Sequence, residues 1–255
     1  LYSVRDSIKN DVPGAIEKVG EMGYKFVEPA GYGDGKFYGM DPVAFKALCE
    51  ENGMSVLSSH TGRPAPDSSN MNETMGWWET CIDAHVAVGA KFIVQPSMED
   101  SAYESLGGLK QWCDYFNMVG EMCNAKGIRF GYHNHSKEFS TKPDSTISVY
   151  DFMLQNTDPA KVMFEMDLYW TVMGGANPVD YFNKYPGRFE LWHIKDKAEL
   201  GDSGLMDFAA IWAAAAQSGM KYGVVEVEEY NFDEFTSCQK SLEFLNNSEF
   251  VVMPE

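Results

Sequence analysis

Two histidines stand two residues apart in the segment GYHNH, where His133 and His135 flank Asn134. Side chains at positions i and i+2 of a strand point to the same side. The same spacing recurs in three later segments: Glu165 with Asp167, His193 with Lys195, and Glu226 with Glu228. If these faces turn inward, buried carboxylates and imidazoles converge, which is costly unless a proton or a cation holds them. A mixed set of histidines and carboxylates suits Mn, Co, Zn or Fe(II) better than calcium, so the pattern predicts one divalent metal ion.

The elements that must position these residues alternate regularly along the chain. Eight apolar segments have strand length and are rich in Val, Ile, Phe or Tyr: residues 1–4, 24–28, 54–60, 91–96, 128–135, 162–170, 189–196 and 222–230. Eight helix-like segments lie between and after them: residues 11–22, 41–52, 70–88, 105–126, 146–155, 177–185, 205–218 and 232–245. Such alternation implies a parallel sheet, and eight units close into a barrel. A doubly wound open sheet is the second choice, but no GxGxxG motif follows the first strand. We therefore predict an α/β fold, a single (β/α)8 TIM barrel domain over residues 1–255.

Polar residues at the strand ends should form the mouth of this barrel, because active sites of such barrels lie at the carboxyl ends of the strands. Glu28, His60 and Gln95 also end predicted strands, and four of the five histidines belong to the mouth. We expect substrate contacts from five residues: His60, Glu28, Gln95, Trp170 and Glu228. Structural roles stay open for three of them: His60 as a hydrogen-bonded core residue, Gln95 as a hydrogen-bonding residue of the mouth, and Glu228 as a solvated residue.

The chain is strongly acidic, with 38 Asp and Glu against 20 Lys and Arg and a formal net charge of −18. Nucleic acid and anionic membrane surfaces are bound by clustered basic residues, so we expect neither partner. The five cysteines are odd in number and form no CxxC pair, which argues against a zinc ribbon or a disulfide framework. No apolar run reaches the ~20 residues that span a bilayer.

The first residues bear on localisation. The sequence begins at Leu1 without a methionine, and LYSVR resembles the end of a strand. We expect that the first strand is trimmed at the N-terminus, and the loss of a signal peptide with it stays open. A cytoplasmic and a periplasmic location therefore both stay open.

Five motifs in this order resemble those of one family: VLSSHTG at residues 56–62, YHNH at 132–135, MDLYW at 166–170, HIKD at 193–196 and VVEVEEY at 224–230. They resemble the xylose isomerase-like TIM barrels, the sugar phosphate isomerase/epimerase group that includes tagatose 3-epimerase, inosose dehydratase and endonuclease IV. The resemblance covers essentially the whole chain. In the epimerases of this group, Glu, Asp, His and Glu from strands five to eight bind one metal, and the two glutamates serve as opposed acid/base groups.

The resemblance implies roles for this chain's own residues. Asp167, His193 and Glu226 match three metal ligands, whereas His133 stands where the first glutamate is expected. We interpret His133 as the replacement ligand. The catalytic residues implied are four: Glu226 and Glu165 as acid/base groups, His135 as acid, base or hydrogen-bond donor, and Lys195 neutralising developing charge. Glu165 could instead be the fourth ligand, and Lys195 could instead form a structural ion pair with Asp196.

The first functional hypothesis is a metal-dependent isomerase or epimerase of a keto-sugar or related carbohydrate, acting by proton abstraction next to a metal-polarised oxygen. The second is a dehydratase or β-eliminating lyase that uses the same chemistry. A non-catalytic sugar-binding barrel is more remote, and the net charge argues against an apurinic endonuclease. We expect an unphosphorylated substrate, because few basic residues are available near the strand ends to bind a phosphate. They are Arg5, Arg63, Lys137 and Lys195. Four aromatic residues would suit sugar stacking or a homo-oligomer interface: Tyr32, Tyr38, Trp78 and Trp170.

Overall fold

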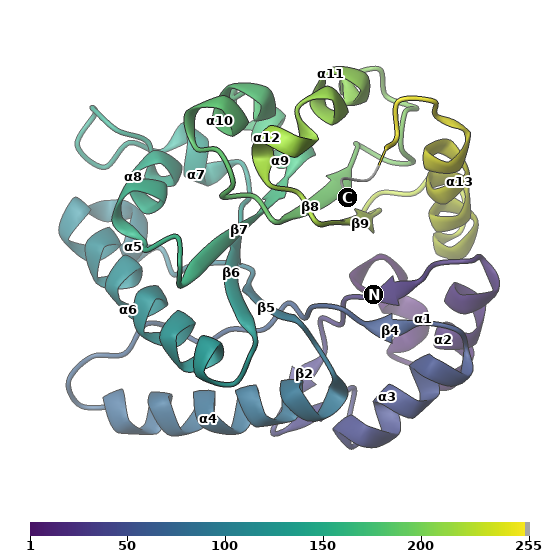
Figure 1. Ribbon diagram of the computed structural model, residues 1–255, viewed down its shortest axis with the longest axis horizontal. Coiled ribbons are helices and arrows are strands. Elements are labelled where there is room, and N and C mark those ends of the chain that lie inside the picture. The colour runs from purple at the N-terminus through teal and green to yellow at the C-terminus, as the bar shows by residue number, and fades with distance from the viewer. Residues whose placement is uncertain (253–255) are drawn as a thin grey trace.

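The computed structural model of the chain describes residues 1–252 and has parallel strands surrounded by helices (Figure 1). Seven strands follow the predicted apolar segments: β1 (Phe26–Val27), β4 (Ser55–Val56), β5 (Phe92–Gln95), β6 (Arg129–His133), β7 (Val162–Asp167), β8 (Leu191–Lys195) and β9 (Tyr222–Glu226). β1 pairs with β4, and β5 to β9 form one five-stranded sheet in chain order, all parallel. A single parallel bridge between His60 and Val94 connects the segment after β4 to β5.

The register of the strands brings their polar ends together. His133 lies beside Glu165, Asp167 beside His193, and Lys195 beside Glu226 in neighbouring strands. All of these residues lie at or near the carboxyl ends of β6 to β9. The predicted mouth is therefore formed by adjacent strands of one sheet.

The helices follow the predicted segments closely: α2 (Val12–Glu21), α3 (Pro42–Glu51), α4 (Met71–Val88), α6 (Leu106–Ala125), α8 (Val149–Asn156), α10 (Pro178–Lys184), α11 (Phe208–Ala213), α12 (Ala215–Ser218) and α13 (Glu234–Asn247). α3 shows the local reasons, because Asp41 accepts a hydrogen bond from Val43 N–H and Pro42 occupies the first turn. Four short helices lie in the connections: α1 (Arg5–Ile8), α5 (Ser101–Glu104), α7 (Lys137–Ser140) and α9 (Leu168–Met173).

Apolar residues fill the structure on both sides of the strands. A large cluster between the strands and the helices includes Phe116, Phe130 and Trp192, all fully buried. A small cluster of Leu57, Phe92, Val94, Met163 and Leu191 draws on β5, β7, β8 and the segment after β4. Met163, Glu165 and Asp167 share one face of β7 because side chains alternate. The inner face of β7 thus changes from apolar to acidic toward the carboxyl end.

The prediction of a strand at residues 1–4 is wrong. Tyr2–Val4 form a 3₁₀ turn (η1), in which Val4 N–H donates to Leu1 O at 3.2 Å, and the chain then turns into α1. Leu1 contacts the segment after β1, where its amino group donates to Glu28 O at 2.5 Å, and Ser3 Oγ accepts from the N–H of Val227, which follows β9. Among residues 1–252, no backbone hydrogen bond joins β9 to β1. The described residues therefore form a parallel α/β structure without a paired eighth strand.

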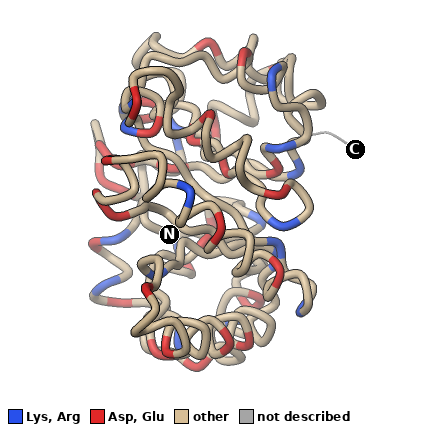
Figure 2. Tube along the Cα trace, turned by 90° about the vertical axis from the view of Figure 1, so that its left-hand side faces the viewer, with Lys and Arg blue, Asp and Glu red and all other residues tan. Residues whose placement is uncertain are grey.

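The glycine-rich segment 31–39 contains a small hairpin of β2 (Tyr32–Gly33) and β3 (Lys36–Phe37). Its turn is Asp34-Gly35, with φ of 49° and 76°, and Asp-Gly is a favoured pair for such left-handed turns. Along the whole trace, acidic and basic positions are interspersed on many elements (Figure 2). In the part of the chain described, no helix combines the length and apolarity that a membrane span requires.

Candidate active site

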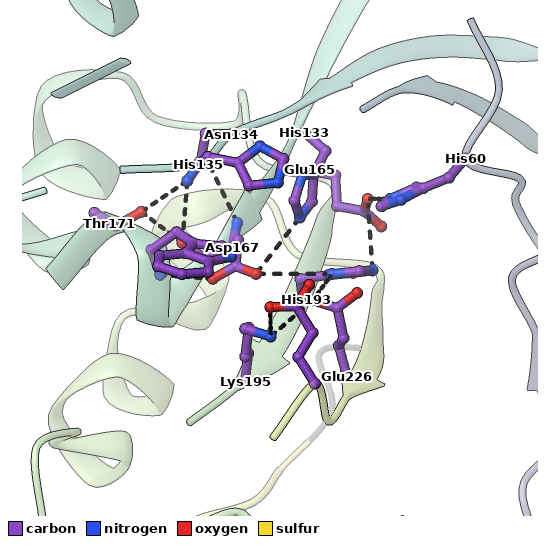
Figure 3. Close-up of polar contacts among 12 residues, drawn as sticks. His60, His133, Asn134, His135, Glu165, Asp167, Thr171, His193, Lys195 and Glu226 are labelled. Carbon is purple, nitrogen blue, oxygen red and sulfur yellow. Dashed lines mark hydrogen bonds and ion pairs between the residues drawn. The ribbon is translucent and has the colours of Figure 1, made fainter. Parts of the chain in front are cut away.

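Four side chains from four adjacent strands meet at the mouth: His133 of β6, Asp167 of β7, His193 of β8 and Glu226 of β9 (Figure 3). One ligand atom of each lies within 4.8 Å of the other three, and all four residues are buried. Asp167 Oδ2 lies 3.5 Å from His133 Nε2 and 3.8 Å from His193 Nδ1, and Glu226 Oε2 lies 3.5 Å from His193 Nδ1. We call these four residues the metal cluster.

The atoms of the metal cluster have the properties of metal ligands. Among residues 1–252, both ring nitrogens of His133, Nδ1 of His193 and Oδ2 of Asp167 are buried without a hydrogen-bond partner. Buried polar atoms of this kind are rare because they lose solvation without compensation. Two imidazoles and two carboxylates also balance the charge of a divalent transition-metal ion. The residues present therefore fit such an ion.

Local structure explains how Asp167 presents one oxygen to the cluster. Asp167 caps the N-terminus of α9, where its Oδ1 accepts a hydrogen bond from Trp170 N–H at 2.7 Å. Oδ2 is left facing the histidines. Burial alone would raise the pKa of Asp167, but His133 and His193 outweigh burial and lower it. The carboxylate is therefore ionised at neutral pH.

His193 has one occupied and one free nitrogen. Nε2 lies 2.9 Å from Glu28 Oε1, whereas Nδ1 faces Asp167 and Glu226. Glu28 also accepts a hydrogen bond from the Ser58 hydroxyl and lies 3.0 Å from His60 Nε2. Burial disfavours a charged Glu28, but His60 and His193 lower the pKa of this carboxyl below its usual range. Glu28 thus lies beneath the cluster; the predicted contact between Glu28 and substrate stays a prediction.

Glu165 lies one pleat deeper than Asp167 and is fully buried. Its Oε2 is 2.7 Å from His60 Nε2, and its Oε1 has no hydrogen-bond partner in the described chain. Burial and the charge of Glu28 raise the pKa of Glu165 to about 8. A second set of ligand atoms, from His60, His133, Glu165 and His193, also lies within 4.8 Å of one another. In this second set the side chains of His60 and Glu165 already hydrogen-bond to each other. The metal cluster defined above is therefore the better candidate for a metal site.

Lys195 lies next to the metal cluster on β8 and is 1% exposed. Its Nζ is 3.2 Å from Glu226 Oε2 and 2.6 Å from Glu228 Oε2, and it lies 5.6 Å from the centre of the Trp170 ring. Burial disfavours the charged amine, but Glu226 and Asp167 raise the pKa of Lys195. Its partners are therefore Glu226 and Glu228, and Asp196 instead accepts from the Gly201 and Lys197 N–H groups.

His135 follows the end of β6, and its ring centre lies 6.1 Å from that of Trp170. Its backbone N–H donates to Glu138 Oε2 at 3.0 Å. Glu138 is buried and also accepts from the hydroxyls of Tyr132 (2.5 Å) and Tyr103 (2.9 Å). This network holds the turn that carries His135 at the mouth.

The other residues expected at the mouth do not all lie there. Gln95 holds two loops together, because its Oε1 accepts from Arg63 N–H and its Nε2 donates to Ser97 O. Trp170 lies at the mouth, as described. Trp78 was placed there wrongly: it is fully buried, and its Nε1 donates to Tyr115 Oη at 2.6 Å. Tyr32 packs on Trp77 and His85, and Tyr38 Oη accepts from Ala30 N–H.

Sequence reasoning missed three residues that support the site: Asn134, Glu138 and Ser58. Asn134 hydrogen-bonds to the backbone of Asp167, Glu138 to the backbone of His135, and Ser58 to the carboxylate of Glu28. Asn134 and Ser58 lie inside the motifs YHNH and VLSSHTG, which was the available signal. The partners of Asn134 and Ser58 are about 30 positions away in the sequence, so these hydrogen bonds could not be predicted from it.

Parallel strands with surrounding helices and a polar cluster at their carboxyl ends define an α/β fold of the type in which catalytic sites lie at that end. The chain belongs to the family described as "Xylose isomerase-like TIM barrel", which it matches over residues 16–248. The resemblance drawn from the motifs is therefore confirmed.

Three related proteins show what the chain is similar to. The structure of a sugar phosphate isomerase/epimerase from Parabacteroides distasonis ATCC 8503 is 34% identical, with a TM-score of 0.89, over 98% of this chain and 97% of that one. An inosose dehydratase of Geobacillus kaustophilus (strain HTA426) is 22% identical over 218 residues, which are 74% of this chain but only 66% of that protein. The apo structure of an E. coli 3-keto-D-glucoside 4-epimerase shares the fold, with a TM-score of 0.71 and 19% identity over 94% of this chain and 95% of that one. The chain thus belongs to a family of sugar-modifying enzymes.

Proposed function

We propose that the protein is a metal-dependent isomerase or epimerase of an unphosphorylated keto-sugar or related carbohydrate. The observation that carries the proposal is the metal cluster, in which ligand atoms from four adjacent strands converge. Among residues 1–252, those of His133, Asp167 and His193 are buried without hydrogen-bond partners. One divalent metal ion, when bound, supplies a Lewis acid that polarises a carbonyl or hydroxyl oxygen of the substrate. Mixed histidine and carboxylate ligands favour Mn, Zn, Co or Fe.

Side chains on two sides of the metal cluster then transfer the protons. Burial alone would raise the pKa of Glu226, but His193 and Lys195 lower it well below its usual value, so Glu226 is ionised and can act as base. His135 lies on the other side of Asp167 (Figure 3), and burial lowers the pKa of its ring, so a neutral imidazole stands there. A base and a second acid/base group on opposite sides fit the removal of a C–H proton and its return elsewhere.

Lys195 and Glu165 complete the proposed machinery. Lys195 is cationic and lies 3.2 Å from Glu226 Oε2, so it can stabilise negative charge that develops on the substrate. Glu165, with its pKa raised to about 8, is largely protonated at neutral pH and can donate a proton toward the cluster.

The absence of a phosphate on the substrate is inferred from the basic residues near the mouth. Each of the four already has a partner: Arg5 with Tyr230, Arg63 with Glu73, Lys137 with Asp100, and Lys195 with Glu228. A phosphate group needs an available cation or a helix N-terminus. A phosphorylated sugar that is turned over much faster than its neutral counterpart would contradict this part of the proposal.

A dehydratase or β-eliminating lyase is the second candidate, and two observations favour it. The curated Geobacillus relative is named an inosose dehydratase. His133 also stands where the related epimerases have an acid/base glutamate, which leaves Glu226 as the only carboxylate of the cluster besides Asp167. Elimination needs one base and one group that protonates the leaving hydroxyl, and Glu226 with Lys195 could supply both.

Product analysis by NMR in D₂O distinguishes the candidates. The metal-loaded protein is incubated with a panel of neutral keto-sugars and inososes, beside the Glu226→Gln variant as a control that lacks the proposed base and one proposed metal ligand. Isomerase or epimerase action incorporates deuterium at one carbon without loss of mass from the carbon skeleton or its hydroxyls. Elimination instead releases water or an aglycone. If the loaded protein binds sugar but yields neither deuterated nor dehydrated product, a non-catalytic binding barrel replaces both candidates.

A further inference from the structure

Glu28 contacts a residue of β8, a strand with which β1 does not pair. It follows β1, which pairs with β4 only, whereas His193 belongs to β8 of the five-stranded sheet. The Glu28 side chain is 5% exposed, and its Oε1 lies 2.9 Å from His193 Nε2. A buried carboxylate of one sheet therefore contacts a member of the metal cluster on another.

The contact distinguishes the two nitrogens of His193. A neutral imidazole carries one N–H and one lone pair, and the hydrogen bond made by one nitrogen decides which the other presents. The acceptor at Nε2 is Glu28, so the N–H lies there. Once a metal ion has displaced the other ring proton, Nδ1 presents its lone pair on the side of Asp167 Oδ2 and Glu226 Oε2, which lie at 3.8 and 3.5 Å.

Both oxygens of Glu28 are occupied, which argues against a direct role in binding metal. Oε2 accepts a hydrogen bond from the Ser58 hydroxyl, and Oε1 contacts His193 and also lies 3.0 Å from His60 Nε2. The His60 ring stacks on the His193 ring, with centres 4.9 Å apart and planes 20° apart. Glu28, Ser58 and His60 together restrict how the His193 ring can turn.

We propose that Glu28 is a positioning residue: by accepting the Nε2–H of His193, it makes Nδ1 the metal-binding atom and holds the ring in place. This inference rests on the proposed function, because it assumes that the metal cluster binds a metal ion. Carboxylates behind ligating histidines also raise the basicity of the ring, and their loss costs about 10–100-fold in metal affinity.

The test compares the Glu28→Gln variant with the wild type and with a matched control, Glu190→Gln. Glu190 is also a buried carboxylate, but it precedes β8 at the opposite end of the strand and pairs with Arg129 and Lys221. Affinity for Zn²⁺ and Co²⁺ is measured by competition with a chelator, and the absorption bands of the Co²⁺ proteins report the ligand geometry. NMR of the ¹⁵N-histidine-labelled Zn²⁺ protein follows the exchange of the His193 Nε2 proton.

We expect Glu28→Gln to weaken metal binding by about 10–100-fold, to shift the Co²⁺ bands and to speed exchange of the Nε2 proton, whereas Glu190→Gln changes none of these. Unchanged affinity and bands in a folded Glu28→Gln protein would overturn the inference but leave the proposed function standing. A wild type that binds neither metal would instead overturn the proposed function and this inference with it. If Glu28→Gln does not fold, the Ser58→Ala variant decides, because it removes the hydrogen bond to the Glu28 carboxylate but keeps the carboxylate itself. Weaker metal binding with shifted Co²⁺ bands in Ser58→Ala supports the inference. Unchanged metal binding and bands overturn it.

Discussion

The side-chain amide of Asn134 pairs with the backbone of Asp167 much as one strand pairs with another. Its Oδ1 accepts Asp167 N–H at 3.1 Å, and its Nδ2 donates to Asp167 O at 3.2 Å. Asn134 is fully buried and directly follows β6, and Asp167 ends β7. These two hydrogen bonds fix Asp167, which caps α9 with one carboxylate oxygen and faces His133 and His193 with the other.

Replacing Asn134 by Ala should therefore affect both stability and metal binding. The buried Asp167 N–H loses its acceptor, whereas Asp167 O keeps the Thr171 hydroxyl as a donor. We therefore expect the free energy of unfolding to fall by about 1–3 kcal/mol. Metal affinity should fall by about tenfold or more because Asp167 is no longer held. Urea unfolding and chelator competition measure the two effects. The control is Asn124→Ala, which removes an exposed amide bond to Ala160 O. Equal effects of both variants on metal affinity would contradict this role of Asn134.

A second prediction separates a metal ligand from an acid/base group within the same motif. His133→Ala should lower metal content because both of its buried ring nitrogens lack other partners. His133→Glu should bind metal but change the reaction, since a carboxylate can both ligate and move protons. His135→Ala should keep its metal and lose turnover. Elemental analysis and turnover assays check these outcomes, and full metal content in His133→Ala would show that His133 is no ligand.

Much of the fold could be predicted from local signals. The apolar segments from 24–28 onward each contain a parallel strand, and caps such as Asp41 and Asp233 mark where helices begin. The strand ends were less predictable. Residues 162–170 form one apolar run, but Asp167 accepts from Trp170 N–H and starts α9 there. The segment 1–4 was misread because its composition suits a strand while its hydrogen bonds form a turn.

The site was predictable where it depended on strand alternation and not where it depended on distant partners. Asp167, His193 and Glu226 converge as the spacing and register imply. Glu28 was expected to face substrate, but the sequence did not reveal that it contacts His193, 165 positions away. The sequence also could not choose between His133 and Glu165 as ligand. Both are buried, but hydrogen bonding favours His133, because Glu165 is paired with His60.

The third prediction concerns Glu165 and pH. Its pKa is raised from 4.5 to about 8 in the folded protein by burial and by Glu28. The folded state therefore holds this proton more tightly than the unfolded state, so its contribution to stability is fully present below about pH 4.5 and is lost as the pH rises through about 8. Glu165→Gln mimics the protonated form. Without metal, it should be more stable than the wild type at pH 8 by a few kcal/mol, at about 1.4 kcal/mol per pKa unit, and by little at pH 5.

Urea unfolding of the two chelator-treated proteins at both pH values checks this expectation. A stability difference that does not change with pH would show that Glu165 is not held protonated. With metal present, Glu165→Gln should also cut turnover by about 10²–10⁴-fold, as expected for a positioned acid/base group.

The fourth prediction is that metal binding weakens in acid. Burial disfavours a charged His193 ring, but Glu165 and Glu226 raise its pKa well above the usual value. The metal-free ring is therefore protonated at neutral pH, and a metal ion at Nδ1 must displace a proton. Metal affinity should fall by about tenfold for each unit of pH decrease while one proton is displaced. Chelator competition at pH 6, 7 and 8 measures this dependence, and a constant affinity over that range would contradict it.

The most direct test of the metal cluster is anomalous scattering from crystals of the protein loaded with Mn²⁺ or Co²⁺. We expect one strong peak bounded by four atoms: His133 Nε2, Asp167 Oδ2, His193 Nδ1 and a carboxylate oxygen of Glu226. The Asp167→Ala crystal, loaded in the same way, serves as the control and should lose the peak. A peak coordinated by Glu165 with His133 outside its sphere, or no peak in the loaded wild type, would contradict the metal cluster as defined above.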